Sequence, residues 1–226
     1  KLYLANQDRI AQQVQHREAS EFKKDKLKVL AELTKLRQIC CDPHLHYADY
    51  KAGSAKLDTC MELVHGALDG GHRILLFSQF TGMLDIIGKR LAKEDIAFLK
   101  LTGASSKESR AKMVAQFQAG EVPVFLISLK AGGVGLNLTA ADVVIHYDPW
   151  WNVAAQDQAT DRAHRIGQQH TVTVYKLIAK DTIEERIMQM QESKRDLVNS
   201  VLGGDGISSA LFTREDVLAL LGGDGR

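Results

Sequence analysis

The sequence has 226 residues, of which 45% are hydrophobic and 25% are charged, and its formal net charge is +1. These values are ordinary for a globular protein of one large domain or slightly more, and they exclude binding to nucleic acids or membranes through overall charge. The three cysteines, Cys40, Cys41 and Cys60, lack the C-x-x-C spacing of a zinc site, so we expect free thiols in a reducing compartment.

The ends of the chain carry few signals. Residue 1 is lysine, and we expect the chain to be a piece of a longer protein. No apolar run approaches the roughly 18 residues that span a membrane, and no signal peptide opens the chain. We therefore expect no membrane partner.

The first 50 residues are predicted to be helical. They contain no glycine and one proline, Pro43, and apolar residues recur at helical intervals between Leu27 and Leu36. Gly53 and Ser54 mark a turn, and Ser54 is placed to cap a helix that runs to about residue 68.

Short apolar segments of strand character follow, and amphipathic segments of helical period separate most of them. The strand segments do not alternate cleanly between polar and apolar residues, so we expect both faces of the strands to be buried. This pattern predicts an α/β fold with an open, mainly parallel sheet and helices on both faces. The expected strands are 73–78, 96–101, 123–128, 142–147 and 172–178, and the expected helices are 81–93, 107–119 and 152–164.

The C-terminal part is predicted to be helical again. A charged helix is expected over 182–200, and a glycine-rich link separates it from TREDVLALL, where Thr213 and Asp216 have the spacing of a capping box. The expected domains are a helical segment over 1–53, the α/β lobe over 54–180, and C-terminal helices over 181–226 that pack on the lobe or extend from it.

Three glycines in KAGGVGLNLT follow the strand expected at 123–128 and suit a loop that approaches a phosphate group closely. A dinucleotide-binding fingerprint does not fit, because the strand expected near Asp142 leaves no room for its helix. The P-loop pattern G-x-x-x-x-G-K-[ST] is absent from the sequence, as is an acidic strand end that would hold Mg²⁺. The chain is therefore not expected to hold Mg-ATP by itself, and a tight structural turn also accounts for the glycines.

The segment DRAHRIGQ, residues 161–168, places two arginines three positions apart. On a continuous helix of about 100° per residue, Gln158, Arg162 and Arg165 share one arc beside an apolar arc of alanines. One interpretation is a plain surface ion pair between Asp161 and Arg165. The other is an anion between the guanidinium groups, and a γ-phosphate supplied by another domain matches their planar forks, as in an arginine finger.

Four stretches resemble the helicase motifs of the C-terminal RecA-like lobe of Swi/Snf-type ATPases, a branch of superfamily two. The resemblance covers nearly the whole chain and is most specific from Asp148 to Gln168, because D-R-A-H-R-I-G-Q is typical of that branch. The four stretches are ILLFSQFTGMLDII, LTGASSKESRAKMVAQF, ISLKAGGVGLNLTAADVVIHYDPWWN and QDQATDRAHRIGQ.

The resemblance implies an ATP-driven motor that moves along double-stranded DNA and remodels protein–DNA complexes. ATP and Mg²⁺ would be held mainly by an N-terminal RecA-like lobe of the same protein. The location would be the nucleoid of a bacterial cell or the nucleus of a eukaryotic one. The residues implied on the nucleotide side are Arg162 and Arg165 at the γ-phosphate, Gln158 in support, and Gly133, Gly135 and Asn137 beside the cleft.

The other motif residues are implied to line the DNA groove. Most offer hydroxyl, amide or glycine N–H groups at strand ends, which contact phosphates without reading bases. For Arg110 a structural salt bridge is an equally open alternative. The implied DNA-binding residues are Ser78, Gln79, Thr102, Gly103, Arg110, Ser128 and Lys130.

Other functions compete with that of a motor lobe when the sequence alone is considered. A strand-separating helicase lobe shares the same motifs, and a catalytically silent interaction module would have no use for the paired arginines. A self-contained small-molecule α/β enzyme would need a cofactor loop that the sequence lacks. We expect no metal site among the histidines, and no ATP hydrolysis by this chain alone.

Overall fold

The structure, a computed structural model, divides into two compact units. Residues 52–178 form the sheet unit, which contains every strand that the structure describes, and residues 1–51 with 179–226 form the helical unit. The division of the sequence into three domains remains a prediction. The structure describes residues 1–16, 19–132, 136–151, 153–163, 171–193 and 213–222.

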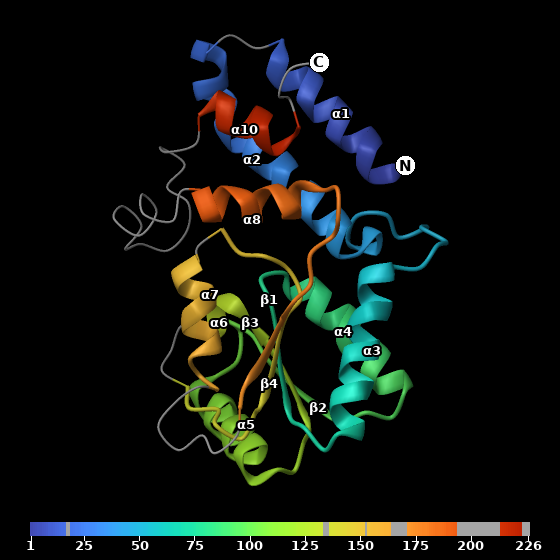
Figure 1. Cartoon of the computed structure of the whole chain (residues 1–226), viewed down its shortest axis with the longest axis vertical. Helices are drawn as coiled ribbons and strands as arrows, with labels where there is room; N and C mark the ends of the chain where they lie inside the picture. Colours follow the sequence, from blue (N-terminus) through green and yellow to red (C-terminus); the bar gives the residue numbers. More distant parts are fainter. Residues whose placement is uncertain (17–18, 133–135, 152, 164–170, 194–212, 223–226) are drawn as a thin grey trace. The chain divides into compact units, whose positions relative to one another are not determined.

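The apolar segments of the sequence form one five-stranded sheet with the order β2-β3-β1-β4-β5 (Figure 1). All four strand pairings are parallel, which confirms the predicted open parallel α/β fold. The strands are β1 (Ile74–Ser78), β2 (Phe98–Leu101), β3 (Val124–Ser128), β4 (Val143–His146) and β5 (Thr173–Lys176).

Burial of the strands follows their place in the sheet. Every residue of β1, β3 and β4 is buried, as expected for strands that are covered on both faces. The same expectation is wrong for β5, where all four residues are exposed. This strand lies at the edge of the sheet and pairs only with β4 in the part of the chain that the structure describes.

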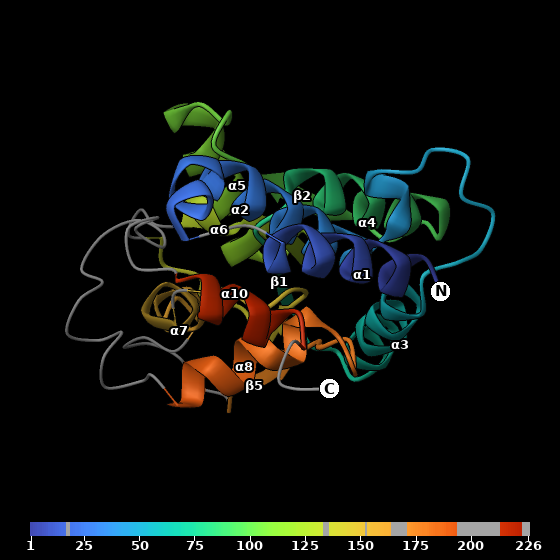
Figure 2. The same ribbon diagram turned by 90° about the horizontal axis from the view of Figure 1, so that it is seen from above.

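Helices cover both faces of the sheet (Figure 1, Figure 2). One face carries α3 and α4, and the other carries α5, α6 and α7. Phe117 of α5, Ala131 of α6 and Ala159 of α7 share one buried cluster with Phe77 and Phe125 of the sheet. The helices are α3 (Ala55–Asp69), α4 (Thr81–Lys93), α5 (Lys107–Ala119), α6 (Leu129–Gly132) and α7 (Val153–Thr160).

The helical unit is held together by contacts between segments that are far apart in the sequence. The Ile183 amide donates to the hydroxyl of Tyr3 (2.6 Å), and Gln7 Nε2 donates to the Leu221 carbonyl (2.7 Å). The capping box predicted for Thr213 and Asp216 is present. The unit contains α1 (Leu2–Gln15), α2 (Ala19–Cys41), η1 (Pro43–Leu45), α8 (Ile183–Ser193) and α10 (Arg214–Leu220).

Two general properties concern membranes and metals. None of the described helices combines the length and apolarity needed to cross a membrane. Within the described residues, no three His, Cys, Asp or Glu side chains gather so that they could hold a metal ion. Cys40, Cys41 and Cys60 form no disulfide in the part of the chain that the structure describes.

Candidate functional site

The C-terminal ends of the parallel strands meet along one edge of the sheet, which is where ligands of open α/β sheets bind. Ser78 ends β1, Ser128 ends β3, and the two residues are direct partners in the strand register. Thr102 follows Leu101, the last residue of β2, which pairs with Ile127 of β3. The sheet therefore gathers residues from three of the sequence motifs.

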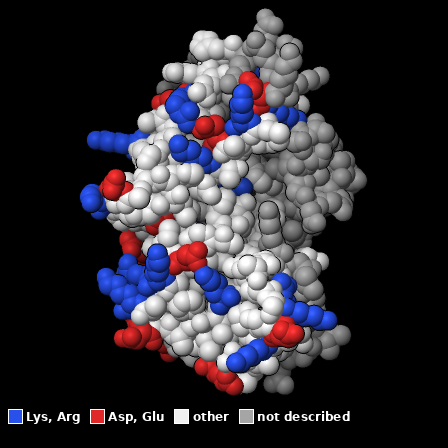
Figure 3. All heavy atoms as spheres, turned by 180° about the vertical axis from the view of Figure 1, so that it is seen from behind, with Lys and Arg blue, Asp and Glu red and all other residues white. Residues whose placement is uncertain are grey.

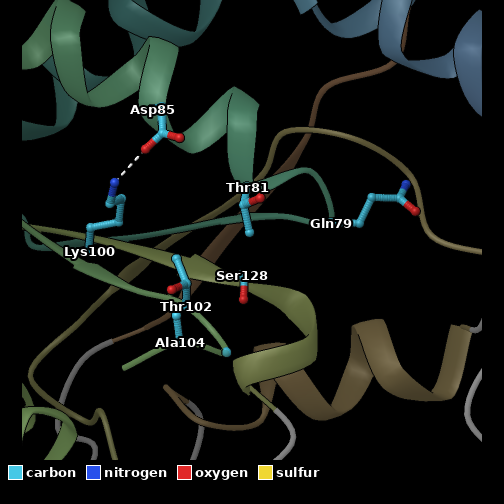
Figure 4. Close-up of a pocket in the computed structure, with 8 residues that line it drawn as sticks. Gln79, Thr81, Asp85, Lys100, Thr102, Ala104 and Ser128 are labelled. Carbon is cyan, nitrogen blue, oxygen red and sulfur yellow. Dashed lines mark hydrogen bonds and ion pairs between the residues drawn. The ribbon is translucent and has the colours of Figure 1, made fainter. Parts of the chain in front are cut away.

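A pocket of about 440 Å³ opens at this edge (Figure 4). Four of the predicted DNA-binding residues line it, namely Gln79, Thr102, Gly103 and Ser128. The sequence did not indicate the remaining lining residues, which are Thr81, Asp85, Lys100 and Ala104.

Local hydrogen bonds shape the floor of the pocket. The Ser128 hydroxyl accepts from the Ala131 amide (3.3 Å), so its own hydrogen remains to donate. The Thr102 amide donates to Ser105 Oγ (3.2 Å), which holds the turn after β2. A Cβ placed on Gly103 would meet nothing within 4 Å, so the pocket is open above this residue.

A buried carboxylate, Asp148, organises the neighbouring strand ends. Ser78 Oγ donates to its Oδ1 (2.5 Å), and the side-chain amide of Gln79 donates to its Oδ2 (2.7 Å). Ser78 and Asp148 are 0% and 1% exposed, respectively, so Ser78 supports the site from within and does not line the pocket. Sequence reasoning missed Asp148, although its place directly after an apolar strand is a usable signal.

The other predicted DNA-side residues are not part of the pocket lining. Arg110 donates from Nη1 to the Ala131 carbonyl (3.0 Å), which ties α5 to α6. Lys130 belongs to α6, and its side chain lies outside the described residues, as do Gly133 and Gly135 entirely. Asn137 lies exposed after the undescribed part of the glycine loop.

The helix that precedes the paired arginines is shorter than expected. The helix predicted over 152–164 ends at Thr160, and the Ala163 amide bonds to the Thr160 carbonyl (3.0 Å) in a tight turn. The shared arc predicted for Gln158 and Arg162 is therefore wrong: Gln158 is exposed on α7, whereas Arg162 lies in the turn and is 1% exposed. Arg165 is outside the described residues.

The prediction that alanines of this segment face the core is confirmed. Ala159 and Ala163 are buried against the sheet, as the predicted alanine arc required. The Arg162 carbonyl accepts from the Leu138 amide (3.1 Å), so the turn after α7 is attached to the segment that follows the glycine loop. The structure thus brings Arg162 next to the segment that contains Asn137, and both residues belong to the implied nucleotide side.

Two buried polar side chains fix α7 to the end of β4. Gln156 Oε1 accepts from the Trp150 amide (3.3 Å), and His146 Nε2 lies 2.9 Å from Thr160 Oγ1. Because the Thr160 hydroxyl donates to the Gln156 carbonyl, we assign the imidazole hydrogen to Nε2 of His146. Burial, and then the charge of Lys176, lowers the pKa of His146 to about 4, so this side chain is neutral at pH 7.

We expect acidification to destabilise the sheet unit through His146. The unfolded chain binds a proton on this residue below pH 6.5, whereas the folded chain does so only near pH 4. Stability is therefore lost as the pH falls through this window, by about 2 kcal/mol between pH 7 and pH 5. Denaturant unfolding of wild type and His146→Gln at both pH values measures this loss. An equal pH dependence in the two proteins would refute the assignment.

Comparisons with known proteins identify the family of the chain. The family model described as helicase conserved C-terminal domain matches residues 55–167, which is half of the chain. An uncharacterized ATP-dependent helicase of Mycoplasma pneumoniae is 41% identical over 222 residues, which are 97% of this chain and 21% of that protein. The chromatin-remodeling ATPase INO80 of Cryptococcus neoformans is 46% identical over 165 residues, which are 73% of this chain and 9% of that protein.

A solved structure extends the likeness to three dimensions. The Sulfolobus solfataricus SWI2/SNF2 ATPase core in complex with double-stranded DNA has a TM-score of 0.79 at 34% identity, and the match covers 97% of this chain and 46% of that one. The chain spans about a fifth or less of the length of the curated relatives named above.

Proposed function

Because the chain belongs to the Swi/Snf-type ATPases of superfamily two, as their C-terminal RecA-like lobe, we propose that it is the second lobe of an ATP-driven motor that moves along double-stranded DNA and remodels protein–DNA complexes. The pocket at the strand ends is the observation that carries this proposal. It gathers hydroxyl groups and an open glycine from separate strands at the edge where such folds bind ligands.

The lining of the pocket suits the phosphate backbone of DNA and not the bases. Thr102 and Ser128 offer hydroxyl groups and Gly103 permits close approach, whereas the side-chain amide of Gln79 already donates to Asp148 and to the Pro149 carbonyl. Such groups contact phosphates without sequence information, which is what a motor that moves along any sequence requires. Lys130 and Arg110 would add charge near the same edge.

ATP and Mg²⁺ are assigned to a separate N-terminal lobe of the same protein. The sequence has no P-loop, and the described carboxylates and histidines form no group that could hold a metal ion. When bound, ATP supplies the phosphoanhydride bond whose hydrolysis drives movement. We assign its phosphate end to Arg162 and Arg165, with Gln158 in support and with Gly133, Gly135 and Asn137 beside the cleft.

The burial of Arg162 adds a condition to this assignment. Its side chain is 1% exposed in the turn after α7, so the turn has to present it when the two lobes close on ATP. Closure that completes a catalytic site is common among enzymes that transfer phosphoryl groups. The two lobes together, and not this chain alone, would therefore form the active enzyme.

Phosphate release by the intact protein and by the 226-residue chain tests the proposal. We expect the intact protein to hydrolyse ATP faster when duplex DNA is added, to a similar extent with duplexes of different sequence, and the chain alone to be inactive. ATP hydrolysis by the chain alone that azide does not inhibit would contradict the proposal. Separation of the strands of a labelled duplex would instead assign the helicase function.

A further inference from the structure

The pocket at the strand ends contains one pair of opposite charges that the sequence motifs did not indicate. Of the eight described residues that line it, Lys100 carries the single positive charge and Asp85 the single negative charge. Lys100 Nζ and Asp85 Oδ1 form an ion pair between β2 and α4, which Figure 4 shows at one end of the pocket.

The ion pair is not explained by a need to stabilise the fold. The side chains of Lys100 and Asp85 are 39% and 51% exposed. Pairs that are this accessible to water add little to folding stability. The lysine is nevertheless held at one end of the pocket, because Asp85 lies one turn into α4 and pairs with it across to β2.

The groups around this lysine are those that bind a phosphate. Figure 4 shows Thr81, Thr102 and Ser128 between the ion pair and Gln79. Thr81 is the first residue of α4, and no side chain caps the start of this helix, so its positive end adds to the field in the pocket. A single ammonium group beside hydroxyls and an open glycine suits one phosphate.

We propose that this pocket holds one backbone phosphate of DNA, that Lys100 is its cation, and that Asp85 is the internal anion which the phosphate displaces. This inference rests on the proposed function and identifies the charged contact of the same site. In the absence of DNA, Asp85 keeps the lysine paired. A phosphate that enters exchanges one ion pair for another, and the original pair forms again when DNA leaves.

This exchange suits a motor that grips and releases DNA in every cycle. Asp85 competes with the phosphate for the same ammonium group and thereby weakens the grip. Because both side chains are exposed to water, we expect this effect to be modest. The rest of the visible surface agrees with such a local arrangement, because lysine and arginine side chains alternate with acidic ones and form no single basic face (Figure 3).

The cation is tested by measuring how salt weakens binding of the intact protein to a short labelled duplex. We expect Lys100→Gln to bind about threefold to tenfold more weakly, with the slope of log affinity against log salt reduced by about one. Lys93→Gln is the matched control, since this exposed lysine lies about 12 Å along α4 from Asp85 at 1.5 Å per residue. Its slope should remain that of the wild type.

The displaced anion is tested in the same assay. Asp85→Asn should bind about twofold to fivefold more tightly, and this gain should vanish in the Lys100→Gln background. Gly103→Val adds bulk where the chain itself leaves open space, so it should weaken binding and leave the thermal unfolding midpoint close to that of the wild type.

The results that overturn the inference differ from those that overturn the proposed function. An unchanged salt slope in Lys100→Gln, or an equal gain from Asp85→Asn in both backgrounds, overturns the inference while DNA-stimulated ATP hydrolysis persists. A raised KM for ATP at saturating DNA, with the salt slope unchanged, would assign the pocket to the nucleotide and also overturn it. Failure of the wild-type protein to bind duplex DNA would overturn the proposed function itself.

Discussion

Replacing Arg165 or Arg162 with alanine in the intact protein is expected to lower ATP turnover by about a thousandfold or more while ATP binding persists. The proposed role of these guanidinium groups is to neutralise the charge that develops on the γ-phosphate in the transition state. Such a contact contributes little to binding of the ground state, so the loss should appear in kcat and not in the Kd for ATP. Single-turnover kinetics and binding of a labelled nucleotide measure the two quantities separately.

The buried position of Arg162 calls for a control on folding. This side chain is 1% exposed, so alanine also removes packing inside the sheet unit, and the thermal midpoint of each variant has to be measured with its turnover. Arg90→Ala is a suitable control, because Arg90 pairs with Glu94 on the opposite face of the sheet. Loss of ATP binding in the Arg165 variant, with turnover retained, would count against the assignment.

Replacing Asp148 with alanine is expected to cost about 3 to 4 kcal/mol of folding stability, because the Ser78 hydroxyl and the Gln79 side-chain amide lose their buried acceptor. Duplex DNA should also stimulate ATP turnover less, since the orientation of Gln79 at the pocket depends on this carboxylate. Denaturant unfolding gives the first quantity and phosphate release the second.

A second aspartate offers a matched comparison. Asp157 is exposed on α7, and Asp157→Ala should change the free energy of unfolding by no more than about 0.5 kcal/mol. Asp148→Asn should fall between the two, because an asparagine presents an N–H group where one carboxylate oxygen now accepts. A loss below about 1 kcal/mol for Asp148→Ala would show that the network around it is not needed for folding.

The sheet could be predicted from the sequence because its central strands are buried on both faces. The run from Arg73 to Ser78 contains ILLF between polar ends, and the observed strand β1 covers Ile74–Ser78. The same logic failed for β5, where VTVYKLI reads as a buried strand although Val174 and Tyr175 are exposed. Hydrophobic residues indicate a strand, but they do not reveal whether a second layer covers it.

The end of α7 could not be predicted from local pattern. The alanine spacing continues to Ala163, which favours a longer helix. A contact that is distant in sequence opposes it: the Arg162 carbonyl accepts from the Leu138 amide, and a continuing helix would need that carbonyl four residues further along. Helical periodicity carries no information about such a partner.

Asp148 and Lys100 of the candidate site were not predicted for a similar reason, since their partners lie on other elements of the fold. Asp148 meets Ser78 only because β4 lies beside β1, and strand order is not encoded in the local pattern of either strand. Lys100 sits in the apolar run FLKL, and its partner Asp85 lies on the preceding helix. The motif residues Gln79, Thr102, Gly103 and Ser128 were found because a resemblance supplied them. Their meeting in one pocket required the fold.

The attachment of α7 through Gln156 and Thr160 has a mechanical consequence. Gln156, midway along the helix, accepts from the Trp150 amide in the loop before it, and Thr160 joins its last turn to His146 at the end of β4. These two bonds tie the helix to the end of β4 and to the loop that follows it, and so oppose movement of the helix relative to the strand. The turn that follows is also fixed, because the Arg162 carbonyl accepts from the Leu138 amide and Ala163 is buried, so delivery of the Arg162 guanidinium to a neighbouring molecule would rely chiefly on its side-chain torsions.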